Sequence, residues 1–136
     1  MNTKNTDIRS TVDLFSKMFL VYGAYDIIAF VLAYRNGSMA DKSRAFIIGL
    51  GIFMAALAIL KVITGILGLQ QAAGRKLTIH ITLATVAVTL QMLKLIGDVF
   101  GYLPPSRLGI TDLAVSLAAV LSLVLFTKYA KALNRQ

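Results

Sequence analysis

Four long apolar blocks constrain this chain more than any other feature, and they lie at residues 14–34, 45–70, 77–103 and 110–130. A helix needs about 20 residues to cross a bilayer core that is roughly 30 Å thick, and each block is near or above that length. The blocks are rich in Leu, Ile and Ala and lack the strict alternation of outer-membrane strands. We therefore predict an all-α integral membrane protein in which residues 1–136 form one four-helix transmembrane domain.

The segments outside the blocks are short. We expect residues 1–13 to form a polar tail or an interfacial lead-in, and the first block to be retained because no small-residue cleavage site follows it. Gly37 predicts a turn, and Gly74 is suited to a helix carboxyl cap. The Pro104-Pro105 pair is expected to end the third helix. No connection is long enough for another domain, so the function should reside in the membrane or just outside it.

The chain has a net charge of +8, and the distribution of its basic residues predicts how it crosses the membrane. Its basic residues lie mainly at the ends of the blocks and form no continuous stripe, so we expect no nucleic-acid partner. More of them fall on one side of the predicted bundle than on the other, which places both termini in the cytoplasm. The richer side holds Lys4, Arg9, Lys17, Arg75, Lys76, Lys128, Lys131 and Arg135, and the other side holds Arg35, Lys42, Arg44 and Arg107. Because the chain is short and carries no eukaryotic targeting signal, we expect a bacterial cytoplasmic membrane.

The composition excludes several kinds of site. The chain has no Cys, which removes disulfides, thiol redox chemistry and thiolate metal ligands. It has one His and no Glu, which leaves too few ligands for a zinc, haem or di-iron centre. No nucleophile and base form a recognisable catalytic set. We therefore expect no metal and no cofactor, and an intramembrane enzyme ranks behind the other hypotheses.

The 77–103 helix has one polar face. Its polar, charged and smallest residues recur at alternating intervals of four and three, which keeps them on one side of a helix. They are His80, Ala84, Ala87, Gln91, Lys94, Asp98 and Gly101. Threonine hydroxyls can bond to carbonyls of their own helix and so tolerate lipid, and the opposite side holds four of them: Thr78, Thr82, Thr85 and Thr89. We expect the first face to point towards protein or water.

The other helices also have faces that contact with lipid does not explain. The second carries a seam of small residues that lets a neighbouring backbone approach closely, namely Gly51, Ala58, Gly65 and Ala72. The first aligns Phe15, Phe19, Gly23, Asp26, Phe30 and Ala33, and the last aligns Asp112, Ser116, Ala119 and Leu123. Each helix therefore has a side that is expected to face the interior of the bundle.

Depth along the helices predicts which charges meet. Asp26 and Lys94 each lie eight residues before a tyrosine at the outer end, about 12 Å below that boundary, so we expect an Asp26–Lys94 ion pair. A Lys94–Asp98 pair within the helix is the alternative, in the less favourable order. Lys61 lies about 13 Å from the cytoplasmic end with no acid at its depth. It should extend to the interface, bond to carbonyls or meet an anion. His80, Asp98 and Asp112 are shallow enough for solvation at the interface.

One internal similarity allows two interpretations. Asp26, Arg35 and Gly37 recur 72 residues later at a second set of positions, which are Asp98, Arg107 and Gly109. A duplicated two-helix hairpin predicts such a repeat, with its pseudo-two-fold axis along the membrane normal. Chance similarity between two apolar segments is the alternative, because a four-helix protein does not require a duplication.

Charges near the bilayer centre are the strongest functional signal. Each costs at least about 2.5–3.5 kcal/mol on insertion scales, so such residues often have a function. We hypothesise a transport or permeation protein whose path or pocket for an ion or a small anionic solute is lined by Asp26, Lys61, Gln91, Lys94 and Asp98. One bundle of this size encloses little space, so we expect a homo-oligomer. The alternative is a membrane interaction protein, such as an accessory subunit, a lipid-binding module or an immunity factor, in which the charges pair across helices.

Overall fold

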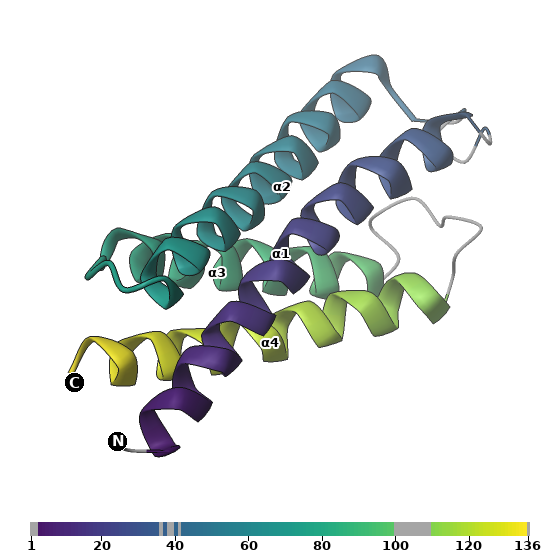
Figure 1. Ribbon diagram of the computed structural model, residues 1–136. Helices are drawn as coiled ribbons and strands as arrows, with labels where there is room; N and C mark the ends of the chain where they lie inside the picture. The colour runs from purple at the N-terminus through teal and green to yellow at the C-terminus, as the bar shows by residue number, and fades with distance from the viewer. Residues whose placement is uncertain (1–2, 36, 38–39, 41, 100–109, 136) are drawn as a thin grey trace.

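Four helices pack side by side in the computed structural model (Figure 1). The structure describes residues 3–35, 37, 40, 42–99 and 110–135. The helices are α1 (Thr3–Arg35), α2 (Arg44–Ala72), α3 (Ile79–Val99) and α4 (Ile110–Asn134). Each contains a stretch long and apolar enough to cross a membrane, so the predicted all-helical fold with four candidate spans is confirmed.

The helices follow one another around the bundle. α1 packs against α2 and α4, and α3 packs against the same two helices. Both termini lie at the end of the bundle that also holds the turn between α2 and α3 (Figure 1). The membrane side on which this end lies stays a prediction, as does the duplicated hairpin. The second copy of the repeat includes Arg107 and Gly109, which lie outside the described residues.

The first helix begins earlier than expected. Residues 3–13 are helical and continue into α1, so they form no separate tail, while their place at the membrane interface stays a prediction. These residues are helical because Ile8 and Val12 follow helical spacing and are buried in the same apolar cluster as Ala130 and Leu133 near the end of α4. Packing against α4 therefore extends α1 beyond its apolar block.

The core at this end of the bundle is aromatic. Phe19 of α1 and Phe126 of α4 meet edge to face, with ring centroids 5.0 Å apart. The His80 ring of α3 lies 5.7 Å from the same phenylalanine. Ala84 and Ala87 are fully buried beside these rings, and their small size lets α3 approach the cluster.

The small-residue seam of α2 brings α1 close to it. A Cβ placed on Gly65 would lie 2.6 Å from the carbonyl oxygen of Ser16, so only glycine fits without a shift of backbone. A Cβ on Gly51 would lie 3.2 Å from the Phe30 ring, which is a tight contact with a side chain. The predicted close approach of a neighbouring backbone is therefore confirmed at Gly65, whereas Gly51 makes room for a side chain.

The two faces of α3 separate as predicted. His80, Ala84, Ala87, Gln91 and Lys94 are all buried, whereas the four threonines of the opposite side are exposed. Two of these threonines donate to carbonyls of their own helix, Thr85 to Ile81 at 3.0 Å and Thr89 to Thr85 at 3.3 Å. The polar stripe therefore faces the other helices, and the threonine side is compatible with lipid.

The ends of α2 have clear local causes. The Ser43 hydroxyl caps the amino terminus by accepting from the Phe46 amide at 3.2 Å, a cap that the sequence analysis did not predict. Gly74 follows the carboxyl end with φ of 114°, a conformation that favours glycine, so its predicted capping role is confirmed.

Gly37, with φ of 77°, occupies a turn as predicted. The predicted stop at Pro104-Pro105 lies outside the described residues.

Candidate functional site

A buried ion pair joins α1 and α2. Nζ of Lys61 lies 2.6 Å from Oδ2 of Asp26, and the two side chains are 1% and 4% exposed. The backbones are close here because Gly23 has no side chain. A Cβ at Gly23 would lie 2.7 Å from Val62 Cγ2 and 3.0 Å from the Ala58 carbonyl oxygen. Lys61 starts beside Gly23 and extends along α1 by about one helical turn to reach Asp26.

The expectation that Lys61 has no acid within reach is wrong. It compared the depths of backbone positions, whereas the long lysine side chain carries its charge about one turn away from its own Cα. Lys94, the residue expected to pair with Asp26, is 5% exposed and donates to Oγ of Ser116 on α4 at 3.1 Å. An Asp26–Lys94 contact stays a prediction. The structure thus places one charged contact within the α1–α2 hairpin and one polar contact between α3 and α4.

Two side chains near these contacts bury polar atoms without a hydrogen bond. Gln91 is fully buried, and within the described part of the chain neither its Nε2 nor its Oε1 has a partner. Thr64 is also fully buried, and its hydroxyl has no partner there. Gln91 precedes Lys94 by about one turn of α3, and Thr64 follows Lys61 by about one turn of α2. Unused donors and acceptors therefore accompany the charged groups.

The hydrogen bond between Gln71 and His80 sets the relative heights of α2 and α3. Lys61 lies ten residues before Gln71, about 15 Å along α2, and Gln91 lies eleven residues after His80, about 16 Å along α3. The two residues therefore lie at similar distances along their own helices. We call the buried polar residues in the middle parts of the four helices the polar layer; they are Asp26, Lys61, Thr64, Gln91, Lys94 and Ser116.

A separate hydrogen-bond network closes the end of the bundle where the termini lie. Gln71 Nε2 donates to the Ala130 carbonyl at 2.9 Å and to Oδ1 of Asn134 at 2.8 Å, while its Oε1 lies 2.6 Å from Nε2 of His80. Asn134 in turn donates to the Leu77 carbonyl at 2.8 Å. His80 is 0% exposed, so its predicted solvation at the interface is wrong. The alternating spacing that predicted its stripe also predicts this burial.

The predicted site residues are only partly described. Asp26, Lys61, Gln91 and Lys94 are buried in the polar layer, whereas the side chain of Asp98 lies outside the described part of α3. Thr64 and Gln71 were not among the site residues predicted from the sequence. The buried face of α2 repeats at intervals of three and four through Lys61, and following that repeat finds them; it contains Leu57, Lys61, Thr64, Gly68 and Gln71.

The arrangement offers groups that can bind a charged ligand. Ammonium, amide and hydroxyl groups can donate to an anion, and a carboxylate lies in the same layer. Comparison of the chain with protein-family models, with curated proteins and with solved structures finds no match, so the interpretation depends on this chemistry.

Proposed function

We propose that the protein is a small transport or permeation protein that passes an ion or a small anionic solute through the polar layer. The observation that carries this proposal is Gln91, a fully buried amide whose polar atoms have no partner within the described chain. Each buried, unbonded group costs about 1–3 kcal/mol. A leucine would avoid that cost, so the amide is better explained as a contact for a ligand than as a packing residue.

Other buried polar groups of the polar layer supply the chemistry of recognition. Lys94 brings a positive charge one turn away on the same face of α3, and its ammonium already donates to the Ser116 hydroxyl. The Thr64 hydroxyl adds another buried donor. Amide, ammonium and hydroxyl donors together suit an anion that has shed its water. We propose a homo-oligomer as the working unit, because a single four-helix bundle leaves little room for a path.

A membrane interaction protein is the second candidate, and the Lys61–Asp26 pair favours it. This pair lies within one hairpin and neutralises both charges at 2.6 Å without a ligand. In that function, the polar contacts would stabilise the bundle, and a partner subunit would bind to its outer surface. Crosslinking in native membranes that yields one dominant heterologous partner would support this candidate.

Flux through proteoliposomes tests the proposal. We expect the purified protein to conduct halides, small carboxylates or protons above the rate of empty liposomes. Gln91→Leu should fold at least as stably and yet lower the flux by about tenfold, the equivalent of one lost hydrogen bond to a charged ligand. Thr89→Val is the matched control, because Thr89 is exposed on the opposite face of α3 and donates only to its own helix. Absence of flux, or unchanged flux in Gln91→Leu, contradicts the proposal.

A further inference from the structure

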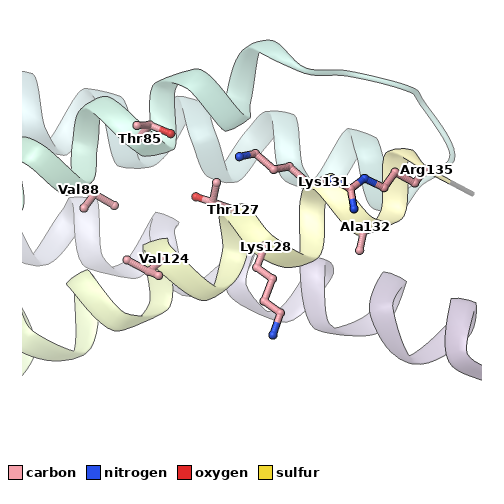
Figure 2. A pocket seen from close by; sticks show the side chains of 8 residues that line it. All are labelled: Thr85, Val88, Val124, Thr127, Lys128, Lys131, Ala132 and Arg135. Carbon is pink, nitrogen blue, oxygen red and sulfur yellow. The ribbon is translucent and has the colours of Figure 1, made fainter.

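A groove of about 560 Å³ runs between α3 and α4 on the outside of the bundle (Figure 2). Its volume falls within the range of small-molecule sites, which is about 300–1,000 Å³. Thr85 and Val88 of α3, Val124 and Lys131 of α4, and Arg135 just after α4 are among the residues that line it. None of them belongs to the polar layer, so this groove is a different feature from the proposed path.

The groove changes from apolar to cationic along α4. Val88 and Val124 line one part of it, and Lys128, Lys131 and Arg135 line the other. From Val124 to Asn134 the helix rises about 15 Å, and Arg135 follows directly. In Figure 2, Lys131 and Arg135 lie on the side of α4 that faces α3, while Lys128 points away from them. A ligand that fits this groove must itself be apolar at one end and anionic at the other.

The cationic part has no acidic neighbour in the sequence. Residues 113–136 contain Lys128, Lys131 and Arg135 and neither Asp nor Glu. No ion pair joins these three cations to a carboxylate among the residues that the structure describes. Two threonines in the groove, Thr85 and Thr127, already donate to carbonyls of their own helices. The basic side chains are therefore the groups available to a negatively charged ligand.

The position of the groove in the bilayer matches its change of polarity. Lys128 and Lys131 lie in the last two turns of the candidate span Leu113–Asn134, and Arg135 follows it. Val124 lies deeper in the same span and is 50% exposed. In a bilayer crossed by this span, the apolar part would face acyl chains and the cationic part would lie near the headgroups.

We propose that this groove binds one anionic phospholipid, with its phosphate on Lys131 and Arg135 and an acyl chain along Val88 and Val124. The guanidinium of arginine can hold two phosphate oxygens at once, and basic pockets between transmembrane helices commonly bind anionic headgroups. A water-soluble anion would leave the apolar half of the groove unused, so the bilayer is the source of the ligand. This inference does not depend on the transport function.

Native mass spectrometry of the detergent-purified protein tests the lipid site. With phosphatidylglycerol and phosphatidylcholine of identical acyl chains, we expect one phosphatidylglycerol bound at least tenfold more tightly than phosphatidylcholine. The Lys131→Gln/Arg135→Gln double variant should weaken that binding by about tenfold or more, because each cation near an anionic surface contributes several-fold. Arg75→Gln/Lys76→Gln removes the same charge from the turn at the same end of the bundle. This control should retain most of the binding.

A second variant tests the apolar half of the groove. Val124→Trp fills the space without changing the charge, and the residue is half exposed, so the fold should tolerate it. We expect it to weaken phosphatidylglycerol binding several-fold while the thermal midpoint stays within a few degrees. If both double variants lose the same amount of phosphatidylglycerol binding, nonspecific electrostatic attraction explains the loss. That result would overturn the proposal. Inorganic phosphate that competes as strongly as the lipid, or a polypeptide that copurifies on this face, would overturn it too.

Discussion

The Lys61–Asp26 ion pair places two opposite charges inside a bundle whose outer surface is largely apolar. Their side chains are 1% and 4% exposed, so solvent screens them little. Removing one partner of a buried pair leaves the other charge uncompensated, which is far more costly than replacing both partners with neutral residues. The loss of one partner should therefore lower the free energy of unfolding far more than the replacement of both partners.

A double-mutant cycle measures this coupling. Asp26→Asn and Lys61→Met should each lower the free energy of unfolding by about 3 kcal/mol or more, whereas the double variant should recover most of the loss. Thermal unfolding in detergent, followed by circular dichroism, reports the effect. The exposed pair of Lys17 and Asp13, with side chains 65% and 41% exposed, is the control. Breaking that pair should cost no more than about 0.5 kcal/mol. Additive losses in the double variant would contradict the coupling.

The partner of Lys61 could not be predicted from depth along the sequence. Helical rise locates Cα atoms, but the Lys61 ammonium lies about one turn from its backbone. That displacement depends on the contact at Gly23, which the spacing of polar residues does not reveal. Gln91 and Lys94 were correctly assigned to the inner face of α3, because the alternating spacing alone determines a face.

Among the helices, α2 depends most clearly on close backbone contact. The carbonyl oxygen of Ser16 leaves no space for a methyl group at Gly65, since the two atoms would be 2.6 Å apart. This constraint explains why the seam of small residues could be recognised from sequence. The start of α1 could not, because residues 3–13 are mostly polar and their helix depends on packing of Ile8 and Val12 against α4.

A pair of glycine substitutions tests this contact. Gly65→Ala should destabilise the protein by about 1–3 kcal/mol, because the backbone of α1 must move to admit the methyl group. Gly49→Ala lies on the same helix with nothing within 4 Å of the added Cβ. This control should be neutral, or stabilising by up to about 1 kcal/mol, because alanine favours helix more than glycine does. Thermal midpoints in detergent provide the measurement, and equal effects at both positions would contradict the close approach.

At the scale of the whole molecule, the two ends of the bundle differ in the segments that they carry. Four spans place both termini and the α2–α3 turn at one end, as Figure 1 shows. Composition and charge at the block ends predicted the spans and this common end, because bilayer thickness fixes helix length. The side of the membrane depends on the cell's insertion machinery and on an uneven distribution of Lys and Arg, which the fold itself does not encode.

Single-cysteine labelling determines the orientation without a background signal, because the chain has no cysteine. Ala40→Cys lies between α1 and α2, and Ala73→Cys lies just after α2; both positions are exposed. With cytoplasmic termini, a membrane-impermeant maleimide should label Ala40→Cys in intact cells. It should label Ala73→Cys only after permeabilisation. The reverse pattern would place the termini outside the cell.

The Lys61–Asp26 contact joins consecutive helices, and this has a consequence for how the chain is synthesised. α1 enters the membrane with a carboxylate that has no lysine from α2 beside it until residue 61 emerges from the ribosome. Once α2 follows, the first hairpin is neutral at this position, and it can leave the insertion machinery for lipid as a pair of helices. The Lys94–Ser116 bond gives the lysine a polar partner within the second hairpin, although a hydroxyl does not neutralise its charge. The first hairpin is thus the one arranged to enter lipid as a neutral unit at this position.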